Sequence, residues 1–180
     1  MTEIYLDVET QKLAEEVPGG WNNIRAFGLT VAVTWDGASG FRHWYEGDVG
    51  RLLGELGAFD RIVTFNGLRF DLEVLSAYGD VRSLIPKSFD VLKDLERRLG
   101  YRVKLQDVAQ ATLGKQKTGS GLDAVQWWRS GDPALRQRVV DYCRMDVEIL
   151  RDIVAYGRRE GSVRVPSRGK ELTVYVAWGE

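Results

Sequence analysis

The first part of the chain alternates apolar and polar residues with the period of two that is typical of β-strands. Residues 4–8 show this alternation and predict a short first strand. After Gly-Gly at positions 19–20, apolar residues recur at every second position from 27 to 35, and Asp36-Gly37 is a strong hairpin signal. Residues 41–46 form the expected return strand. The pattern therefore predicts a three-stranded antiparallel meander.

From residue 49 onward the apolar spacing changes to that of helices. Apolar residues between Val49 and Phe59 fall at helical spacing, and residues 61–65 are typical of a buried strand. Further helices are predicted at residues 68–78, 90–99, 105–113, 121–130 and 133–159. The longest begins at Asp132-Pro133, where an N-capping side chain precedes a proline in the first turn. A meander followed by strands that alternate with helices indicates an α/β fold, with a mixed central sheet flanked by helices.

The C-terminal segment 161–180 returns to strand-like alternation. Apolar residues alternate from Leu172 to Trp178 after Arg168-Gly169, which predicts a terminal hairpin or an edge strand. Such a strand would cover a sheet edge or offer one to a partner. No internal repeat, low-complexity tract or Pro/Ser-rich linker divides the chain, so we expect residues 1–180 to form a single domain.

Composition places the chain among soluble globular proteins, because 44% of its 180 residues are hydrophobic and 28% are charged. The lone Cys143 cannot form an intramolecular disulfide, and no Cys/His cluster suits structural zinc, so we expect a reducing, cytoplasmic location. The N-terminus has early acidic residues and no long apolar run, unlike a signal peptide. No stretch reaches the roughly 18 apolar residues that a membrane span needs.

The charge balance does not by itself indicate a nucleic-acid partner, because 25 basic residues meet 26 acidic ones and the net charge is −1. It is compatible with one if some carboxylates bind cations and the basic residues are clustered. Basic clusters occur at Arg97-Arg98, Arg102 to Lys104, Lys115 to Lys117 and Arg136 to Arg144. Each cluster alone also fits a solvated helix face or loop.

The end of the first predicted strand carries two carboxylates, Asp7 and Glu9. Residues two apart on a strand point to the same face of a sheet, and two anions there are costly unless a cation compensates them. Oxygen-only ligands suit hard divalent metals such as magnesium or manganese. The pair alone also fits a structural role, since Asp-x-Glu at a strand end is common.

Two later motifs carry similar chemistry. Asn66 follows a predicted strand, and Phe70-Asp71 falls in the first turn of the helix after it, where an aspartate also fits a purely dipole-satisfying role. On the C-terminal helix, Tyr142 and Asp146 are four residues apart and therefore share a face. An isolated pair of this kind also fits a tyrosine that packs beside a surface carboxylate.

Taken together and in this order, the three motifs resemble the DEDD superfamily of 3′→5′ exonucleases on the ribonuclease H-like fold, in its tyrosine-bearing branch. That family includes the proofreading domains of family A and B DNA polymerases. The match covers Asp7 to about Asp152. The segment from Lys117 to Asp146 also resembles stand-alone bacterial proofreading-exonuclease-like proteins.

The resemblance implies a role for each matching position. It implies four acidic ligands for two divalent cations, Mg²⁺ or Mn²⁺: Asp7, Glu9, Asp71 and Asp146. Tyr142 would position the attacking water, since a free tyrosine with a pKa near 10 is a poor base at neutral pH. Three residues would bind the terminal nucleotide of the substrate: Thr10, Asn66 and Phe70.

Other candidate residues receive structural interpretations. The single histidine, His43, lies on the third predicted strand, so the histidine-bearing branch of the superfamily is disfavoured. Asp90 is interpreted as a helix N-cap in preference to a metal ligand, and Asp141 should point elsewhere on its helix. Of the adjacent Trp127-Trp128, we expect one ring to pack into the core.

The resulting hypothesis is a metal-dependent 3′→5′ exonuclease that acts on nucleic acid with a free 3′ end and uses a two-metal mechanism. Single-stranded DNA is favoured because of the resemblance to proofreading domains, and RNA is the other possible substrate. Two alternatives stay open, namely a structure-specific endonuclease on the same fold and a non-catalytic nucleic-acid-binding module. No membrane partner is expected.

Overall fold

The computed structural model describes residues 1–115, 120–167 and 169–179. The strands are β1 (Glu3–Thr10), β2 (Leu29–Asp36), β3 (Gly40–Tyr45), β4 (Arg61–Thr64), β5 (Ser88–Asp90), β6 (Ser162–Ser167) and β7 (Lys170–Tyr175). The α-helices are α1 (Val49–Ala58), α2 (Asp71–Leu75), α3 (Val91–Leu99), α4 (Leu105–Leu113), α5 (Gly121–Arg129) and α6 (Pro133–Glu160). Short 3₁₀ turns include η1 (Ala14–Glu16) and η3 (Ile24–Ala26).

Within the described residues, five strands form the main sheet in the order β3-β2-β1-β4-β5. The pairs β1–β2 and β2–β3 are antiparallel, whereas β1–β4 and β4–β5 are parallel. The predicted mixed sheet with an antiparallel meander is therefore confirmed. The sequence pattern missed β5, because a strand of three residues is too short to show a period.

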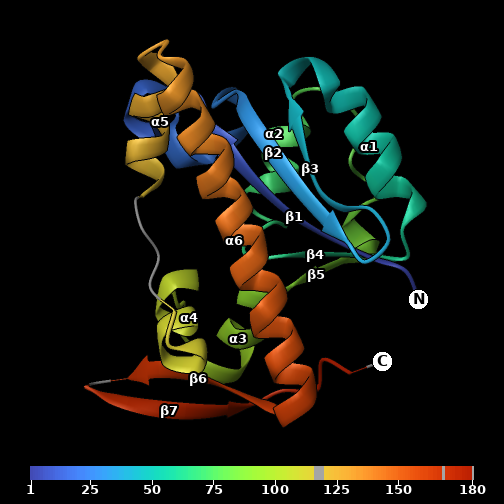
Figure 1. Cartoon of the computed structure of the whole chain (residues 1–180), viewed down its shortest axis with the longest axis vertical. Coiled ribbons are helices and arrows are strands. Elements are labelled where there is room, and N and C mark those ends of the chain that lie inside the picture. The colour runs from blue at the N-terminus through green and yellow to red at the C-terminus, as the bar shows by residue number, and fades with distance from the viewer. Residues whose placement is uncertain (116–119, 168, 180) are drawn as a thin grey trace.

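Two apolar layers cover the faces of the sheet. Ile4 and Leu6 of β1 are buried with Leu52 and Leu56 of α1, whereas Tyr5 points into the opposite layer beneath α6. Figure 1 shows α6 crossing one face of the sheet, with α5 near its N-terminal end and the β6–β7 hairpin near its C-terminal end. The period of two in β1 thus separates the residues that face α1 from those that face α6.

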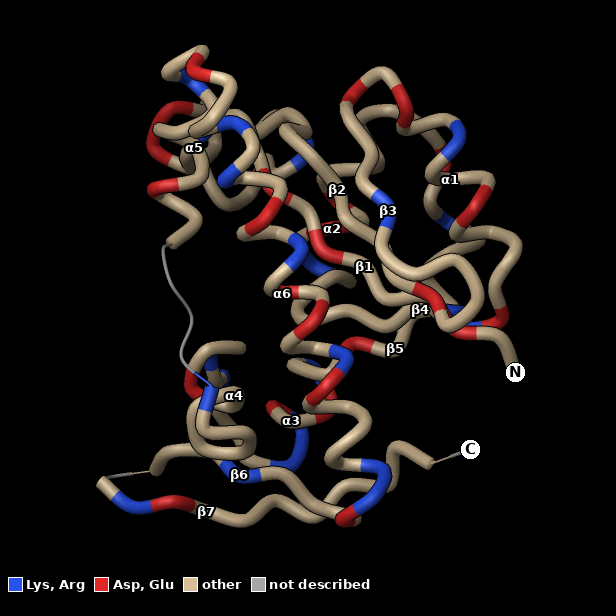
Figure 2. Tube along the Cα trace, viewed as in Figure 1, with Lys and Arg blue, Asp and Glu red and all other residues tan. Residues whose placement is uncertain are grey.

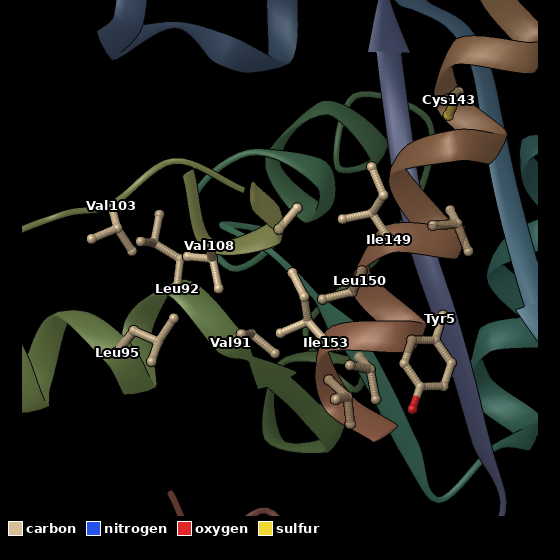
Figure 3. Packing of buried hydrophobic residues seen from close by; sticks show 14 of the residues in the cluster. Tyr5, Val91, Leu92, Leu95, Val103, Val108, Cys143, Ile149, Leu150 and Ile153 are labelled. Carbon is tan, nitrogen blue, oxygen red and sulfur yellow. The ribbon is translucent and has the colours of Figure 1, made fainter. Parts of the chain in front are cut away.

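Helix α6 connects the sheet to the smaller helices. Its start agrees with the prediction, since the Asp132 side chain accepts a hydrogen bond from the Ala134 amide at 2.7 Å and Pro133 follows. Figure 3 shows Ile149, Leu150 and Ile153 of α6 directed toward apolar residues of α3 and α4. A helix of 28 residues is long enough to pack against both the sheet and the smaller helices α3 and α4.

The helix predicted at 68–78 is wrong in extent, because α2 spans only 71–75. The chain before it turns at Asn66, which has a positive φ of 73° and whose carbonyl accepts hydrogen bonds from Arg69 and Phe70. The Asp90 carboxylate accepts the backbone N–H groups of Asn66 and Leu68. This remote carboxylate, which no local periodicity reveals, fixes the segment as a loop.

The predicted C-terminal hairpin is present, but it forms a separate two-stranded sheet beside α4 and adds no strand to the main sheet. Arg168 of its turn lies outside the described residues. After β7, the indole of Trp178 is buried and donates to Asp94 at 2.8 Å, and Arg158 donates to the Trp178 carbonyl at 3.0 Å. Among the helices that the structure describes, none has the length and apolar character of a membrane span.

Gly157 of α6 lets the Trp178 ring approach the helix backbone, since an added Cβ would lie 2.5 Å from the Trp178 ring. We predict that Gly157→Ala lowers the free energy of unfolding by about 1–3 kcal/mol, because the ring must move. Urea titration followed by tryptophan fluorescence measures the change. Gly54→Ala is the control, because nothing lies within 4 Å of its added Cβ, and it should raise stability slightly. Equal effects of the two substitutions would contradict this packing.

Candidate active site

Three carboxylates from two elements meet on the α6 face of the sheet. Asp7 and Glu9 share that face because they are two residues apart on β1, and Asp146 reaches it from α6. Their ligand oxygens all lie within 4.8 Å of one another. Glu9 is only 9% exposed and Asp146 only 6%. This group has the spacing and the oxygen chemistry of a site for a hard divalent cation.

Asp71, at the start of α2, lies outside this group of three but close enough to Asp7 to feel its charge. Burial raises the pKa of the Asp71 carboxyl well above its ordinary value, and the negative charges of Asp7 and Asp90 raise it further. Backbone N–H groups of Val8 and Asp71 itself oppose the rise. One oxygen of Asp71 is buried and accepts no hydrogen bond from the residues that the structure describes. A cation beside Asp7 would satisfy that oxygen and offset the repulsion.

Tyr142 stands one helical turn before Asp146, as predicted from the spacing. It is only 5% exposed, and its ring contacts Trp127 edge-on, with centroids 6.4 Å apart and an interplanar angle of 80°. Trp127 belongs to α5, so this helix fixes the orientation of the Tyr142 ring.

Cys143 is a site neighbour that the sequence motifs did not indicate. Its thiol donates to the backbone carbonyl of Asp7 at 3.3 Å and lies 3.4 Å from the Asp7 carboxylate, and Figure 3 shows it on α6. Burial raises the pKa of the thiol well above its ordinary value, and the charges of Asp7, Glu9 and Asp146 add to the rise. The thiol is therefore protonated and holds α6 against β1 as a neutral donor. Only its position beside Tyr142 could have drawn attention to it.

A cavity of about 400 Å³ opens beside the carboxylates. Its walls include both acidic and apolar side chains: Asp7, Glu9, Thr10, Leu13, Trp21, Phe27, Phe70, Asp71, Leu122 and Val125. The Trp21 ring lies 5.6 Å from the Phe27 ring and 6.3 Å from the Phe70 ring, centroid to centroid. The cavity thus combines a carboxylate edge with an aromatic wall. Of the predicted substrate-binding residues, Thr10 and Phe70 line it.

Asn66 does not line this cavity. Its side-chain oxygen accepts a hydrogen bond from Arg102 at 2.6 Å, and it borders a smaller hollow with Asp90 and Lys93. Asp90 accepts the Lys93 amide at 3.2 Å, so its predicted role as the N-cap of a helix is confirmed. Asp90 also lies outside the three-carboxylate group.

An ion pair fixes the two walls of the cavity relative to each other. Arg129, at the end of α5, contacts both oxygens of Glu16 at 2.6 Å and donates to the Gln11 carbonyl at 2.9 Å. The hydrogen bonds from Arg129 lower the pKa of Glu16 to about 2. This contact ties α5 to the segment that follows β1.

The remaining aromatic candidates lie on strand β3 and helix α5. His43 is exposed on β3, as predicted, and does not approach the carboxylates. Both Trp127 and Trp128 are half-buried and pack against the core, whereas one packed ring was expected. Trp128 stacks on Tyr45 with centroids 6.3 Å apart.

This fold and acidic site define a class of protein. The family model described as the RNase_H superfamily matches residues 4–156, and the chain therefore belongs to that superfamily. This agrees with the predicted ribonuclease H-like fold.

Among solved structures, the chain is similar to the family B DNA polymerase from the hyperthermophilic archaeon Pyrobaculum calidifontis, with a TM-score of 0.65 and 16% identity. The likeness covers 87% of this chain and 24% of the polymerase, so the chain spans about a quarter of that protein's length. At this identity the likeness shows a shared fold. No curated protein matches the sequence significantly.

The buried Asp71 leads to a prediction for the metal-free protein. The pKa of the Asp71 carboxyl in the folded protein lies above its ordinary value of 3.8. The stabilising contribution of the protonated carboxyl is therefore complete below pH 3.8 and is lost as the pH rises through the folded-state pKa. In EDTA, the free energy of unfolding of wild type should therefore fall relative to that of Asp71→Asn as the pH rises. The fall should be about 1.4 kcal/mol for each pH unit between the ordinary pKa of Asp71 and its pKa in the folded protein. Urea titrations from about pH 4 to pH 7 measure this difference. Asp141→Asn, at an exposed position, serves as the control. A pH-independent difference would show that Asp71 is not the repelled carboxyl.

Proposed function

We propose that the protein is a metal-dependent 3′→5′ exonuclease of the tyrosine-bearing type. The observation that carries the proposal is the meeting of Asp7, Glu9 and Asp146 within 4.8 Å, beside a cavity that Asp71 also lines. Membership of the RNase_H superfamily supports nuclease chemistry, and the fold shared with a DNA polymerase supports nucleic acid as the substrate.

The four carboxylates fit two divalent cations, Mg²⁺ or Mn²⁺. Asp7, Glu9 and Asp146 would hold one ion, and Asp7 with Asp71 would hold the other, so Asp7 would serve both ions. Bound there, the ions would supply Lewis-acid chemistry, which lowers the pKa of a water molecule and stabilises charge on a leaving oxygen. None of the described residues donates a hydrogen bond to the buried Asp71 oxygen, and a cation at this place would satisfy it.

The protein's own side chains supply orientation. Tyr142 is held by Trp127 one turn from Asp146, which suits a hydroxyl that positions the attacking water. The aromatic wall of Trp21 and Phe70 offers stacking surface to the terminal base. Thr10 brings a hydroxyl to the same cavity, where it can hydrogen-bond the terminal nucleotide.

The shape of the cavity favours removal of end nucleotides over an internal cut. A volume of about 400 Å³ accommodates a small ligand such as one nucleotide, and its walls are tied together through Arg129 and Glu16. An endonuclease site would need a groove that continues on both sides of the carboxylates. Single-stranded DNA is the favoured substrate because the motifs resemble those of proofreading domains, and RNA is the second candidate.

Replacement of the shared ligand tests the proposal. Asp7→Asn should lower the hydrolysis rate of 5′-labelled single-stranded DNA in Mg²⁺ by at least roughly 100-fold, because it weakens stabilisation at the reacting phosphate. Asp141→Asn is the control, since Asp141 is an exposed acid on α6, the helix that carries Asp146, and it accepts a hydrogen bond from Gln137. Gel electrophoresis of timed samples, with and without EDTA, follows the reaction.

Wild type and the Asp141→Asn control should give a ladder that shortens stepwise from the 3′ end only when metal is present. A single internal product would indicate an endonuclease. Equal activity of wild type and Asp7→Asn, with or without EDTA, would refute the catalytic proposal.

A further inference from the structure

Unpaired arginines gather on one part of the chain. Most arginines in the described residues form ion pairs with carboxylates, whereas five have no carboxylate within 4.0 Å: Arg25, Arg69, Arg136, Arg138 and Arg144. Three of the five lie between residues 136 and 144 of α6. Figure 2 shows basic and acidic segments interspersed over most of the fold. In a chain of net charge −1, phosphate binding requires such a local excess.

Aromatic side chains lie next to these arginines on the edge strand β3. His43 and Tyr45, two residues apart, share the face of β3 that faces α6, and their rings lie 5.5 Å apart. Tyr45, which is 39% exposed, stacks on Trp128 with an interplanar angle of 25°. The three rings therefore form a continuous row that is exposed at His43 and Tyr45 and half-buried at Trp128.

Two arginines contact aromatic rings here and keep their charge at the surface. The Arg136 guanidinium lies 4.8 Å from the centre of the Trp128 ring, and that of Arg144 lies 4.5 Å from the Phe41 ring. Both arginines are exposed. Of the acidic residues of α6, Glu148 and Asp152 pair with Lys115 near α4, and Asp152 also pairs with Arg151. The exposed Asp141 accepts a hydrogen bond from Gln137 at 3.0 Å. A guanidinium fixed on a ring presents donors for a phosphate at low entropic cost.

The strand register relates this row to the candidate active site. Glu9 pairs with Val31 of β2, and Val31 pairs with Tyr45 of β3. Tyr45 and Glu9 therefore lie in one row across the sheet, about 10 Å apart at two strand spacings. A polynucleotide whose 3′ end occupies the cavity is long enough to contact both places.

We propose that His43, Tyr45, Trp128, Arg136 and Arg144, the β3–α6 surface, bind single-stranded nucleic acid outside the catalytic cavity. Arg136 and Arg144 contact phosphates, and the exposed rings stack on bases. The choice of nucleic acid over a protein partner rests on the proposed function, because the same residue types also occur at protein interfaces. Binding itself requires no hydrolysis and can be measured alone.

The test measures the fluorescence anisotropy of a labelled oligothymidylate of about 20 nucleotides in EDTA at increasing NaCl. Arg136→Ala/Arg144→Ala should weaken binding at least about 10-fold and reduce the slope of log affinity against log salt by roughly 1.4, as expected for two lost phosphate contacts. Arg159→Ala/Arg164→Ala is the control, because it also removes two exposed positive charges, from positions that pair with Glu160 and Glu171.

Two further variants separate charge, stacking and folding. Arg136→Lys/Arg144→Lys keeps both charges and should retain the wild-type salt slope. Tyr45→Ala should weaken binding about five-fold or more without changing that slope. Thermal melts identify any variant that fails to fold.

Two results would overturn the proposal: wild type that does not bind the oligonucleotide, or an Arg136→Ala/Arg144→Ala variant that binds with the affinity and salt slope of the control.

Hydrolysis of the p-nitrophenyl ester of thymidine 5′-monophosphate in Mg²⁺ tests the catalytic cavity separately. It should be the same in wild type and the double alanine variant. If the double alanine variant loses binding but keeps this activity, the result supports nucleic-acid binding by the β3–α6 surface. If wild type binds the oligonucleotide but shows no such activity, only the proposed exonuclease function is refuted.

Discussion

Mutual repulsion of buried carboxylates is the constraint around which this structure is arranged. Asp7, Glu9 and Asp146 bring their oxygens within 4.8 Å in a setting that is largely withdrawn from water, and Asp71 adds a fourth charge beside Asp7. Such a group is unfavourable unless a cation compensates it or protons neutralise part of it. The raised pKa of Asp71 is the consequence in the metal-free protein.

The fold provides the energy that holds these charges together. Apolar residues on both faces of β1 fix the strand between two layers, and α6 crosses the sheet at the level of Asp7, where the neutral Cys143 thiol contacts the Asp7 carbonyl. Helix α5 acts on two sides of the site, since Trp127 orients Tyr142 and Arg129 ties the cavity wall to Glu16. Removal of solvent strengthens the attraction of such a site for divalent metal.

The sequence allowed prediction of those parts of the fold and site that depend on local spacing. The i, i+2 relation of Asp7 and Glu9 and the i, i+4 relation of Tyr142 and Asp146 follow from strand and helix geometry, and both pairs lie on the expected elements. Contacts between distant segments could not be predicted in this way. The Asp90 hydrogen bonds that replace a helical turn before α2, the Cys143 contact to Asp7 and the Trp178 contact at Gly157 each join residues far apart in the chain. The placement of Asn66 toward Arg102 depends on such contacts as well.

The central claim is that the four carboxylates form one site for two metal ions, with Asp7 shared between them. Anomalous diffraction from crystals of the protein grown with Mn²⁺ tests this claim directly. The account predicts two manganese peaks, one contacted by Asp7, Glu9 and Asp146 and the other by Asp7 and Asp71. A map with no manganese peak at these carboxylates would contradict it.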